Sequence, residues 1–102
     1  MEIYQVTQED VHEVAELFDS YRVFYEQPSD MEAAKEFIRE RLEKKESVIF
    51  AAVEDGKYIG FTQLYPAFSS ISMKRTWILN DLYVTEESRN KGAGRQLLNA
   101  AK

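Results

Sequence analysis

The spacing of the apolar residues changes near residue 47, and this change limits the possible folds more than any other feature of the chain. Before it, apolar side chains recur three or four positions apart from Val11 to Tyr21 and from Met31 to Leu42, which is the spacing of amphipathic helices. After it, runs rich in β-branched and aromatic residues predict three strands, over residues 48–53, 58–65 and 75–84. This order predicts an α+β domain.

Turn and cap signals join these elements. Asp55-Gly56 stands between two apolar runs, and it predicts a tight hairpin because glycine accepts the positive φ that such turns require. Residues 66–74 are rich in serine and predict a loop before the last strand. Ser29 and Glu32 have the spacing of a capping box, so we expect both to cap the second helix.

A strand over residues 2–6 opens the chain, and a helix over residues 95–102 follows the last strand. The predicted order is therefore strand, helix, helix, three strands and helix. We expect one domain over residues 1–102, with a mixed, mostly antiparallel sheet. The first two helices should cover one face of this sheet and the third helix the other.

The composition excludes several classes of function. The chain has 102 residues, of which 44% are hydrophobic, so it can form a core. It has no apolar run of about 18 residues, and its first residues lack the features of a signal peptide. Cysteine is absent, which excludes disulfides, thiolate metal sites and a cysteine nucleophile. We therefore expect a cytoplasmic protein that binds no metal and does not insert into a membrane.

The charge of the chain bears on its partners. Its formal net charge is −5, which argues against nucleic acid as a partner because binding to phosphates needs clustered Lys and Arg. An acidic surface attracts cationic small molecules such as amines.

The segment from Arg89 to Gly94 lies between a predicted strand and a predicted helix and carries two glycines. Glycines at a helix entrance let the backbone N–H groups approach an anion without interference from a Cβ. The unpaired donors of the first turn and the positive end of the helix dipole then hold phosphate oxygens. Arg89 and Lys91 add positive charge, so the segment predicts a pyrophosphate or a similar anion as ligand.

Two common phosphate-binding motifs do not match this segment. A P-loop requires G-x-x-x-x-G-K-[ST], which the chain lacks. A dinucleotide-binding turn requires a third glycine where Leu97 stands, and an acidic residue about 20 positions further on, which this chain does not have.

The remaining pattern, [R/Q]-x-x-G-x-[G/A] after the strand Leu79-Asn80-Asp81-Leu82-Tyr83-Val84 and before a helix with leucines, resembles motif A of the GNAT superfamily of N-acetyltransferases. The whole chain resembles the N-terminal two-thirds of that fold. The resemblance implies transfer of an acetyl group from acetyl-coenzyme A to a primary amine on a small molecule or a protein. Because no cysteine can carry the acyl group, we expect direct attack within a ternary complex.

The resemblance also implies roles for individual residues. It implies that the backbone of Leu82, Tyr83 and Val84 pairs with the pantetheine arm and that the thioester lies near residues 80–82. An N–H group near Leu82 would stabilise the oxyanion. The pyrophosphate would lie on the amides of Arg89, Asn90, Lys91, Gly92, Ala93 and Gly94.

Asp81 is the best candidate for the base that accepts the proton of the amine, and a purely structural role is its alternative. Asn80 cannot act as a base, but it is a candidate to orient water or substrate. Strand alternation places Asp81 on the same face as Leu79, with Asn80 on the other face. The family lines its acceptor pocket with the end of the first helix, where this chain has Tyr21, Tyr25 and Glu26; core or surface roles are the alternative for these three.

Members of the family continue with a fifth strand, a further helix, closing strands and a tyrosine that protonates the leaving thiolate, and no residue here matches these parts. We therefore expect a domain that is incomplete at its C-terminus and that forms homo-oligomers through the uncovered side of its sheet. One alternative function is a module that binds acetyl-coenzyme A or another anion without catalysis. Another is a structural interaction domain in which the glycines only cap and turn the chain.

Overall fold

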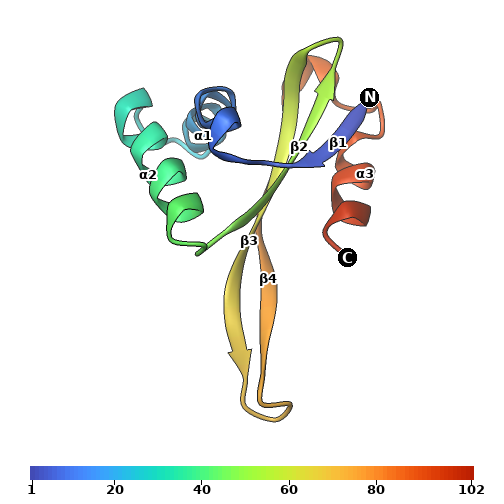
Figure 1. Cartoon of the computed structure of the whole chain (residues 1–102). Helices are drawn as coiled ribbons and strands as arrows, with labels where there is room; N and C mark the ends of the chain where they lie inside the picture. Colours follow the sequence, from blue (N-terminus) through green and yellow to red (C-terminus); the bar gives the residue numbers. More distant parts are fainter.

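The computed structural model describes all of residues 1–102. Its elements follow the predicted order, with two short 3-10 helices added (Figure 1). They are β1 (Glu2–Gln5), η1 (Gln8–Asp10), α1 (Val11–Phe24), α2 (Met31–Glu43), β2 (Val48–Glu54), β3 (Lys57–Ser69), β4 (Lys74–Val84), η2 (Glu86–Ser88) and α3 (Ala93–Ala100).

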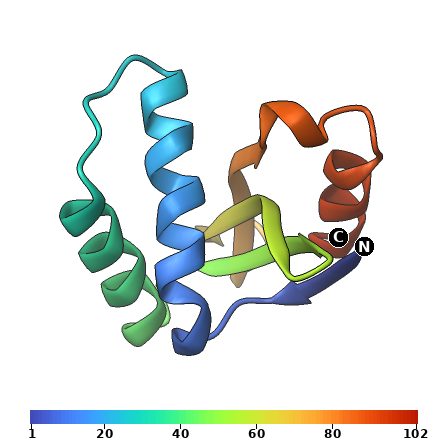
Figure 2. The ribbon, with the colours of Figure 1, turned by 90° about the horizontal axis from the view of Figure 1, so that it is seen from above.

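The four strands form one sheet in the order β1-β2-β3-β4, and every neighbouring pair is antiparallel. α1 and α2 lie together on one face of this sheet, and α3 lies on the other face (Figure 2). The α+β fold predicted from the sequence is thus confirmed, with a sheet that is antiparallel throughout. None of the helices has the length and apolarity that crossing a membrane requires.

Alternating residues of β2 and β3 supply two separate cores. Ala51 and Phe61 are paired across the two strands, and both are fully buried in the core under α1 and α2. Ala52, the strand neighbour of Ala51, points the other way and packs with Leu97 of α3. Ile59 packs there too, because a β-bulge leaves it without a partner on β2 and interrupts the alternation of β3. Alternation along β2 and the bulge in β3 together let two adjacent strands hold helices on both faces of the sheet.

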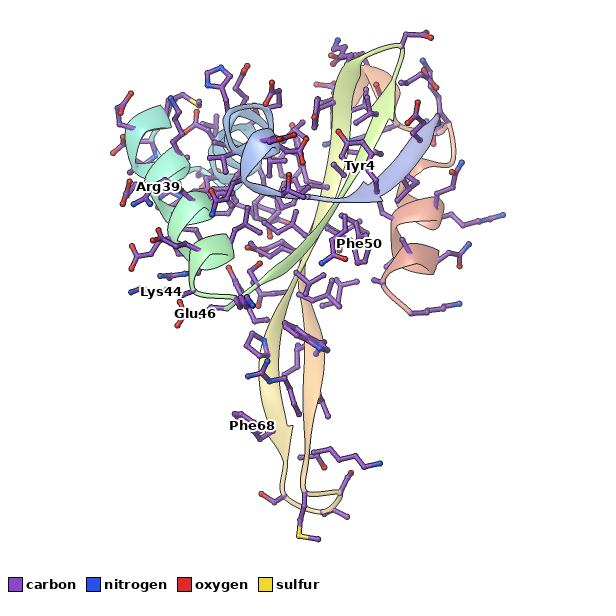
Figure 3. The ribbon with its side chains drawn as sticks, viewed as in Figure 1. Tyr4, Arg39, Lys44, Glu46, Phe50 and Phe68 are labelled. Atoms are coloured by element: carbon purple, nitrogen blue, oxygen red, sulfur yellow. The ribbon has the colours of Figure 1, made fainter.

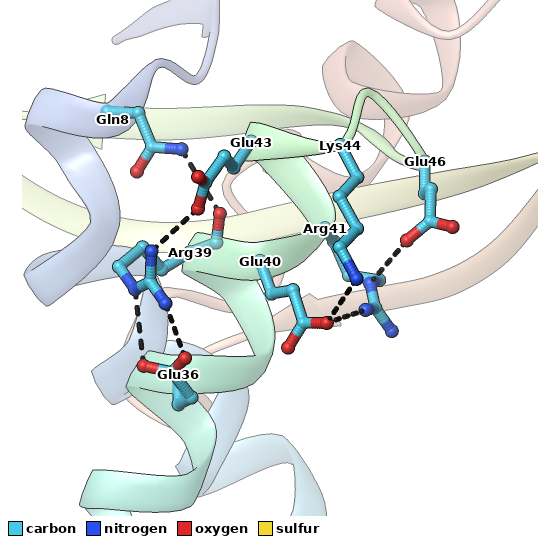
Figure 4. Close-up of polar contacts among 8 residues, drawn as sticks. All are labelled: Gln8, Glu36, Arg39, Glu40, Arg41, Glu43, Lys44 and Glu46. Carbon is cyan, nitrogen blue, oxygen red and sulfur yellow. Dashed lines mark hydrogen bonds and ion pairs between the residues drawn. The ribbon is translucent and has the colours of Figure 1, made fainter.

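The outer surface of α2 carries a strip of ion pairs. These pairs join Arg39 with Glu36 and Glu43, Lys44 with Glu40, and Arg41 with Glu46 (Figure 4). Exposed pairs of this kind contribute little to stability because water and salt screen them. The helix is held instead by its apolar face, where Ala34 and Ile38 are buried against α1 and the sheet.

The predicted capping box of α2 is wrong. The cap is Asp30, whose side chain accepts a hydrogen bond from the Ala33 N–H at 3.1 Å. The Ser29 hydroxyl donates instead to Asp19 of α1 at 2.6 Å, and the Asp30 N–H donates to the other Asp19 oxygen at 2.7 Å. Asp19 is buried, so its carboxylate needs partners, and these bonds fasten the start of α2 to α1.

The predicted loop over residues 66–74 is also wrong. β3 and β4 continue through most of it as a two-stranded arm that projects from the rest of the chain (Figure 1), and Phe68 lies on this arm (Figure 3). Phe68 pairs with Arg75 and Pro66 with Trp77, and the Arg75 guanidinium lies 5.8 Å from the Phe68 and Trp77 rings. These contacts stabilise the arm, and Pro66 lies past the end of β2, where β3 has a free edge that tolerates proline.

Gly60 allows β3, β4 and α3 to meet closely. A Cβ at this position would lie 2.8 Å from the Tyr83 carbonyl oxygen, 3.2 Å from a Val84 methyl group and 3.4 Å from a Leu97 methyl group. The first of these contacts is with the backbone, so no side-chain movement can relieve it. Glycine is therefore required here by close approach of the backbone.

We predict that Gly60→Ala destabilises the chain by about 1–3 kcal/mol, because the added carbon forces the ends of β3 and β4 apart. Urea unfolding followed by circular dichroism measures this change. Gly94→Ala is the matched control, since a Cβ at Gly94 would meet no atom within 4 Å. Equal stability of Gly60→Ala and the unsubstituted chain would contradict the prediction.

Candidate active site and anion-binding loop

A loop with two left-handed residues joins β4 to α3. The Thr85 N–H donates to the Ile59 carbonyl at 2.8 Å, just beyond the end of β4. Asn90 then has φ 72°, and Gly92, which caps α3, has φ 85°. Asparagine and glycine are the residues that adopt this conformation most readily, so the Asn-x-Gly sequence turns the chain into the helix.

The backbone N–H groups of residues 90–95 donate to no acceptor in the chain. The next amide along the chain, that of Gln96, does have a partner: it donates to the Gly92 carbonyl at 3.1 Å. A Cβ at Gly94 would meet open space, so nothing covers the donors there. Unpaired donors at the positive end of a helix dipole make a suitable site for an anion.

The two cations of this loop have different surroundings. Lys91 Nζ lies 3.6 Å from a Glu54 oxygen, and its side chain is 53% exposed. The Arg89 side chain turns the other way, because its Nε donates to the Val84 carbonyl at 3.1 Å and its guanidinium carbon lies 5.2 Å from the centre of the Phe24 ring. The Arg89 N–H is also bonded, to the carbonyl of Glu86.

β4 is an edge strand, and part of its backbone faces outward. Because the Thr85 N–H points to β3 and neighbouring residues of a strand alternate, Tyr83 also points to β3, while Leu82 and Val84 present their N–H and C=O groups to the free edge. The bond from Arg89 to the Val84 carbonyl agrees with this direction.

A β-bulge at Asn80 interrupts the alternation of β4. Asp81 pairs with Gln63 and Leu79 with Leu64, so no residue of β3 lies opposite Asn80. Because Gln63 and Leu64 are consecutive, they face opposite sides of the sheet, and so do Asp81 and Leu79. The prediction that Asp81 and Leu79 share a face is therefore wrong.

Asp81 is buried and accepts two hydrogen bonds. Gln63 Nε2 donates to its Oδ2 at 2.9 Å, and Asn80 Nδ2 donates to its Oδ1 at 3.1 Å. The Ser47 hydroxyl donates in turn to Gln63 Oε1 at 2.7 Å. The sequence reasoning missed Gln63 and Ser47, although a glutamine within an apolar strand was a visible signal of a buried polar contact.

Two tyrosines lie near the Asp81 carboxylate. Burial, followed by the charge of Asp81, raises the pKa of Tyr65 to about 12. Burial, followed by a hydrogen bond with Asp81, raises the pKa of Tyr21. The folded value for Tyr65 lies above the ordinary value of about 10, so its phenol is protonated in the folded chain. Its contribution to stability is complete below pH 10 and is lost as the pH rises through about 12.

The end of α1 forms an aromatic group with the end of β4. The Tyr21 ring centre lies 5.2 Å from that of Tyr25 and 5.9 Å from that of Tyr83. Phe24, which the sequence reasoning missed, lies 5.2 Å from Tyr25 and is 58% exposed. Glu26 has φ 65° and is exposed just beyond the helix, so the structure brings Tyr21 but not Glu26 to Asp81.

Backbone groups therefore supply most of the possible ligands of a bound molecule. They are the free donors of residues 90–95 and the outward groups of Leu82 and Val84, with the Asp81 carboxylate further along the same strand. No group of three or more His, Cys, Asp or Glu side chains is placed to hold a metal ion.

Comparison with known proteins gives a consistent result. The model of the Acetyltransferase (GNAT) family matches residues 11–102. An uncharacterised N-acetyltransferase of Bacillus subtilis, YhfO, is 56% identical over 102 residues, which are 100% of this chain and 68% of that protein. The crystal structure of a probable acetyltransferase is 48% identical, with a TM-score of 0.92 over 99% of this chain and 68% of its own.

A more distant structure shares the fold alone. The predicted acetyltransferase of Clostridium acetobutylicum, solved with acetyl-CoA, is 13% identical, with a TM-score of 0.77 over 98% of this chain and 70% of its own. The match of the family model and the identity to YhfO confirm the resemblance seen in the residues around motif A. The chain belongs to the GNAT family of acetyltransferases.

Proposed function

We propose that this chain binds acetyl-coenzyme A at the loop before α3 and transfers the acetyl group to a primary amine by direct attack within a ternary complex. The observation that carries the proposal is the set of free N–H donors at residues 90–95, at the start of α3. Membership of the family supports acetyl transfer, and the acetyl-CoA bound by the Clostridium protein supports the choice of donor.

The residues of the loop and of β4 suit the parts of this molecule. The diphosphate would accept from the amides of residues 90–95, with the Lys91 ammonium beside them. The two amides of the pantetheine arm would pair with the outward backbone groups of Leu82 and Val84, as an added strand does. Acetyl-coenzyme A would supply the thioester carbon that the amine attacks.

The remaining chemistry needs a base and an oxyanion donor. A protonated amine is not a nucleophile, so a base must accept its proton. We assign this role to the Asp81 carboxylate, which would accept the proton directly or through water. Gln63 and Asn80 hold both oxygens of this carboxylate in place. As the C–N bond forms, the C–S bond breaks, and the coenzyme leaves as a thiolate that takes up a proton. The outward Leu82 N–H is the donor for charge that develops on the thioester oxygen.

We predict that Gly94→Val raises the Kd for coenzyme A at least about tenfold, because its branched side chain covers the free donors and each lost bond to a charged group costs about 1.5–3 kcal/mol. Calorimetry with coenzyme A measures this change. Gln96→Val is the control, since it places the same side chain at an exposed position of α3 whose N–H is already bonded. An unchanged Kd for coenzyme A in folded Gly94→Val would contradict the proposed binding site.

We predict that Asp81→Asn lowers kcat for amine acetylation by about 10²–10⁴ and leaves KM nearly unchanged, because it removes the base and keeps the shape. Thiol release from acetyl-coenzyme A, with spermidine and lysine amide as acceptors, measures the rate. Removal of the charge should also lower the pKa of Tyr65 from about 12, which absorbance at alkaline pH measures.

The two readouts of this variant separate the possible roles. A lower pKa of Tyr65 with an unchanged kcat would show that Asp81 is structural. Binding of acetyl-coenzyme A by the unsubstituted chain without thiol release that depends on an amine would favour a binding module without catalysis.

We also propose that the chain self-associates through the free edge of β4. Beside this edge Trp77, Leu79 and Leu98 are each about 40% exposed and line one groove with Leu64. Residues 74–79 of two copies would pair along this edge, which leaves the outward groups of Leu82 and Val84 for the coenzyme. Light scattering of concentrated protein should show a dimer that Leu98→Glu disrupts and that Ile71→Glu, at the tip of the arm, does not. A monomer at high concentration would contradict this.

A further inference from the structure

We propose that Arg89 is a positioning residue that holds the aromatic end of α1 on β4, and that it is not a ligand of the diphosphate. This inference rests on the proposed function, because it assigns the two cations of the loop to different parts of that site. Lys91 contacts the diphosphate, and Arg89 holds the end of α1 that lines the site of the amine.

The contacts of Arg89 all lead away from the free donors. Its guanidinium carbon lies 5.2 Å from the centre of the Phe24 ring and 5.9 Å from that of Tyr83. Its Nε donates to the Val84 carbonyl at 3.1 Å, which fixes the plane of the group across the two rings. A planar guanidinium stacks on aromatic faces while it donates in its own plane, and a lysine ammonium cannot do both.

Phe24 depends on this contact for its place. The ring is 58% exposed at the last residue of α1, and its aromatic neighbours are Tyr25 at 5.2 Å and Tyr83 at 6.4 Å. Arg89 is the group that connects this helix end to the backbone of β4. Without it, the end of α1 would lose a contact that is independent of the buried core.

The contacts continue from Arg89 towards the proposed base. Phe24 and Tyr83 touch the guanidinium, the Tyr83 ring lies 5.9 Å from Tyr21, and Tyr21 lies next to Asp81. A change at Arg89 is therefore transmitted through aromatic rings to the side of β4 where the amine would lose its proton. Arg89 touches none of the reacting atoms in this arrangement, and it acts through Phe24 and Tyr83.

Lys91 provides the contrast within the same loop. It lies two residues away, is 53% exposed, and its ammonium has a single partner, Glu54, at 3.6 Å. No ring and no backbone carbonyl holds its side chain, so it can turn to an anion at the start of α3. Substitution of either cation by glutamine removes the same charge from the same loop, which makes the two variants a matched pair.

The first test needs no ligand. Hydrogen exchange at the amides of Tyr25 and Gln27, which donate to carbonyls of α1, reports how firmly the helix end is held. Arg89→Gln should speed exchange there about fivefold, as expected for loss of a stacked cation and its hydrogen bond. Lys91→Gln should leave exchange unchanged. Equal exchange in the two variants would overturn the inference, whatever the chain binds.

The second test separates affinity for the coenzyme from use of the amine. Lys91→Gln should raise the Kd for coenzyme A about tenfold and leave the KM for spermidine unchanged. Arg89→Gln should keep that Kd within about threefold, raise the KM about fivefold and leave kcat within about twofold. Phe24→Leu should reproduce the effect of Arg89→Gln on KM, and the double variant should be no worse than the worse single variant.

Each departure from this pattern has a definite meaning. If Arg89→Gln raises the Kd for coenzyme A as much as Lys91→Gln does and leaves the KM for spermidine unchanged, Arg89 is a phosphate ligand and the inference fails. If the effects of Arg89→Gln and Phe24→Leu add, the two residues act independently and the inference also fails. Failure of the unsubstituted chain to bind coenzyme A would refute the proposed function instead, and the exchange measurement would still decide the role of Arg89.

Discussion

The site depends on the close approach of β3 and β4 at Gly60. Because glycine has no side chain, the Tyr83 carbonyl lies 2.8 Å from the position that a Cβ would occupy, and Leu97 of α3 packs against the same point. The end of β4 and the start of α3, on either side of the proposed anion-binding loop, are therefore both fixed against β3. Since the loop spans only residues 85–92, its conformation follows from the positions of these two ends.

The bulge at Asn80 lets the two halves of β4 present their side chains to opposite faces of the sheet. In an unbroken strand, Leu79 and Asp81 would face the same side of the sheet. One extra residue lets Trp77 and Leu79 face α3, while Asp81 and Tyr83 face α1. The first half of β4 therefore belongs to the projecting arm, and the second half carries the carboxylate and the outward backbone groups of the site. Bulges commonly lie next to active sites, where they redirect a side chain, and this one lies next to the proposed base.

These features also define what the sequence could predict. The order of elements and the strand, loop and helix around Gly92 are local patterns, and they were predicted correctly. The bulge, the arm and the cap of α2 depend on contacts between distant segments, such as Ser29 with Asp19, and no local pattern contains them. For the same reason the sequence identified Asp81 as a candidate but not Gln63, which donates to it, or Ser47, which donates to Gln63. The side-chain contacts of Arg89 were equally inaccessible.

The proposed recognition of an anion by an acidic chain poses an electrostatic conflict, and the geometry of the loop offers a solution. The net charge of −5 repels an anion from a distance, but charges on the surface act weakly beyond about 8 Å at physiological salt. Backbone N–H groups act at hydrogen-bond distance, and those of residues 90–95 have no acceptor in the chain. The Lys91 ammonium differs, because it lies 3.6 Å from the Glu54 carboxylate, which partly neutralises its charge. More lysines would acquire such partners in so acidic a chain. Free amides avoid this, and glycine is the residue that leaves them uncovered.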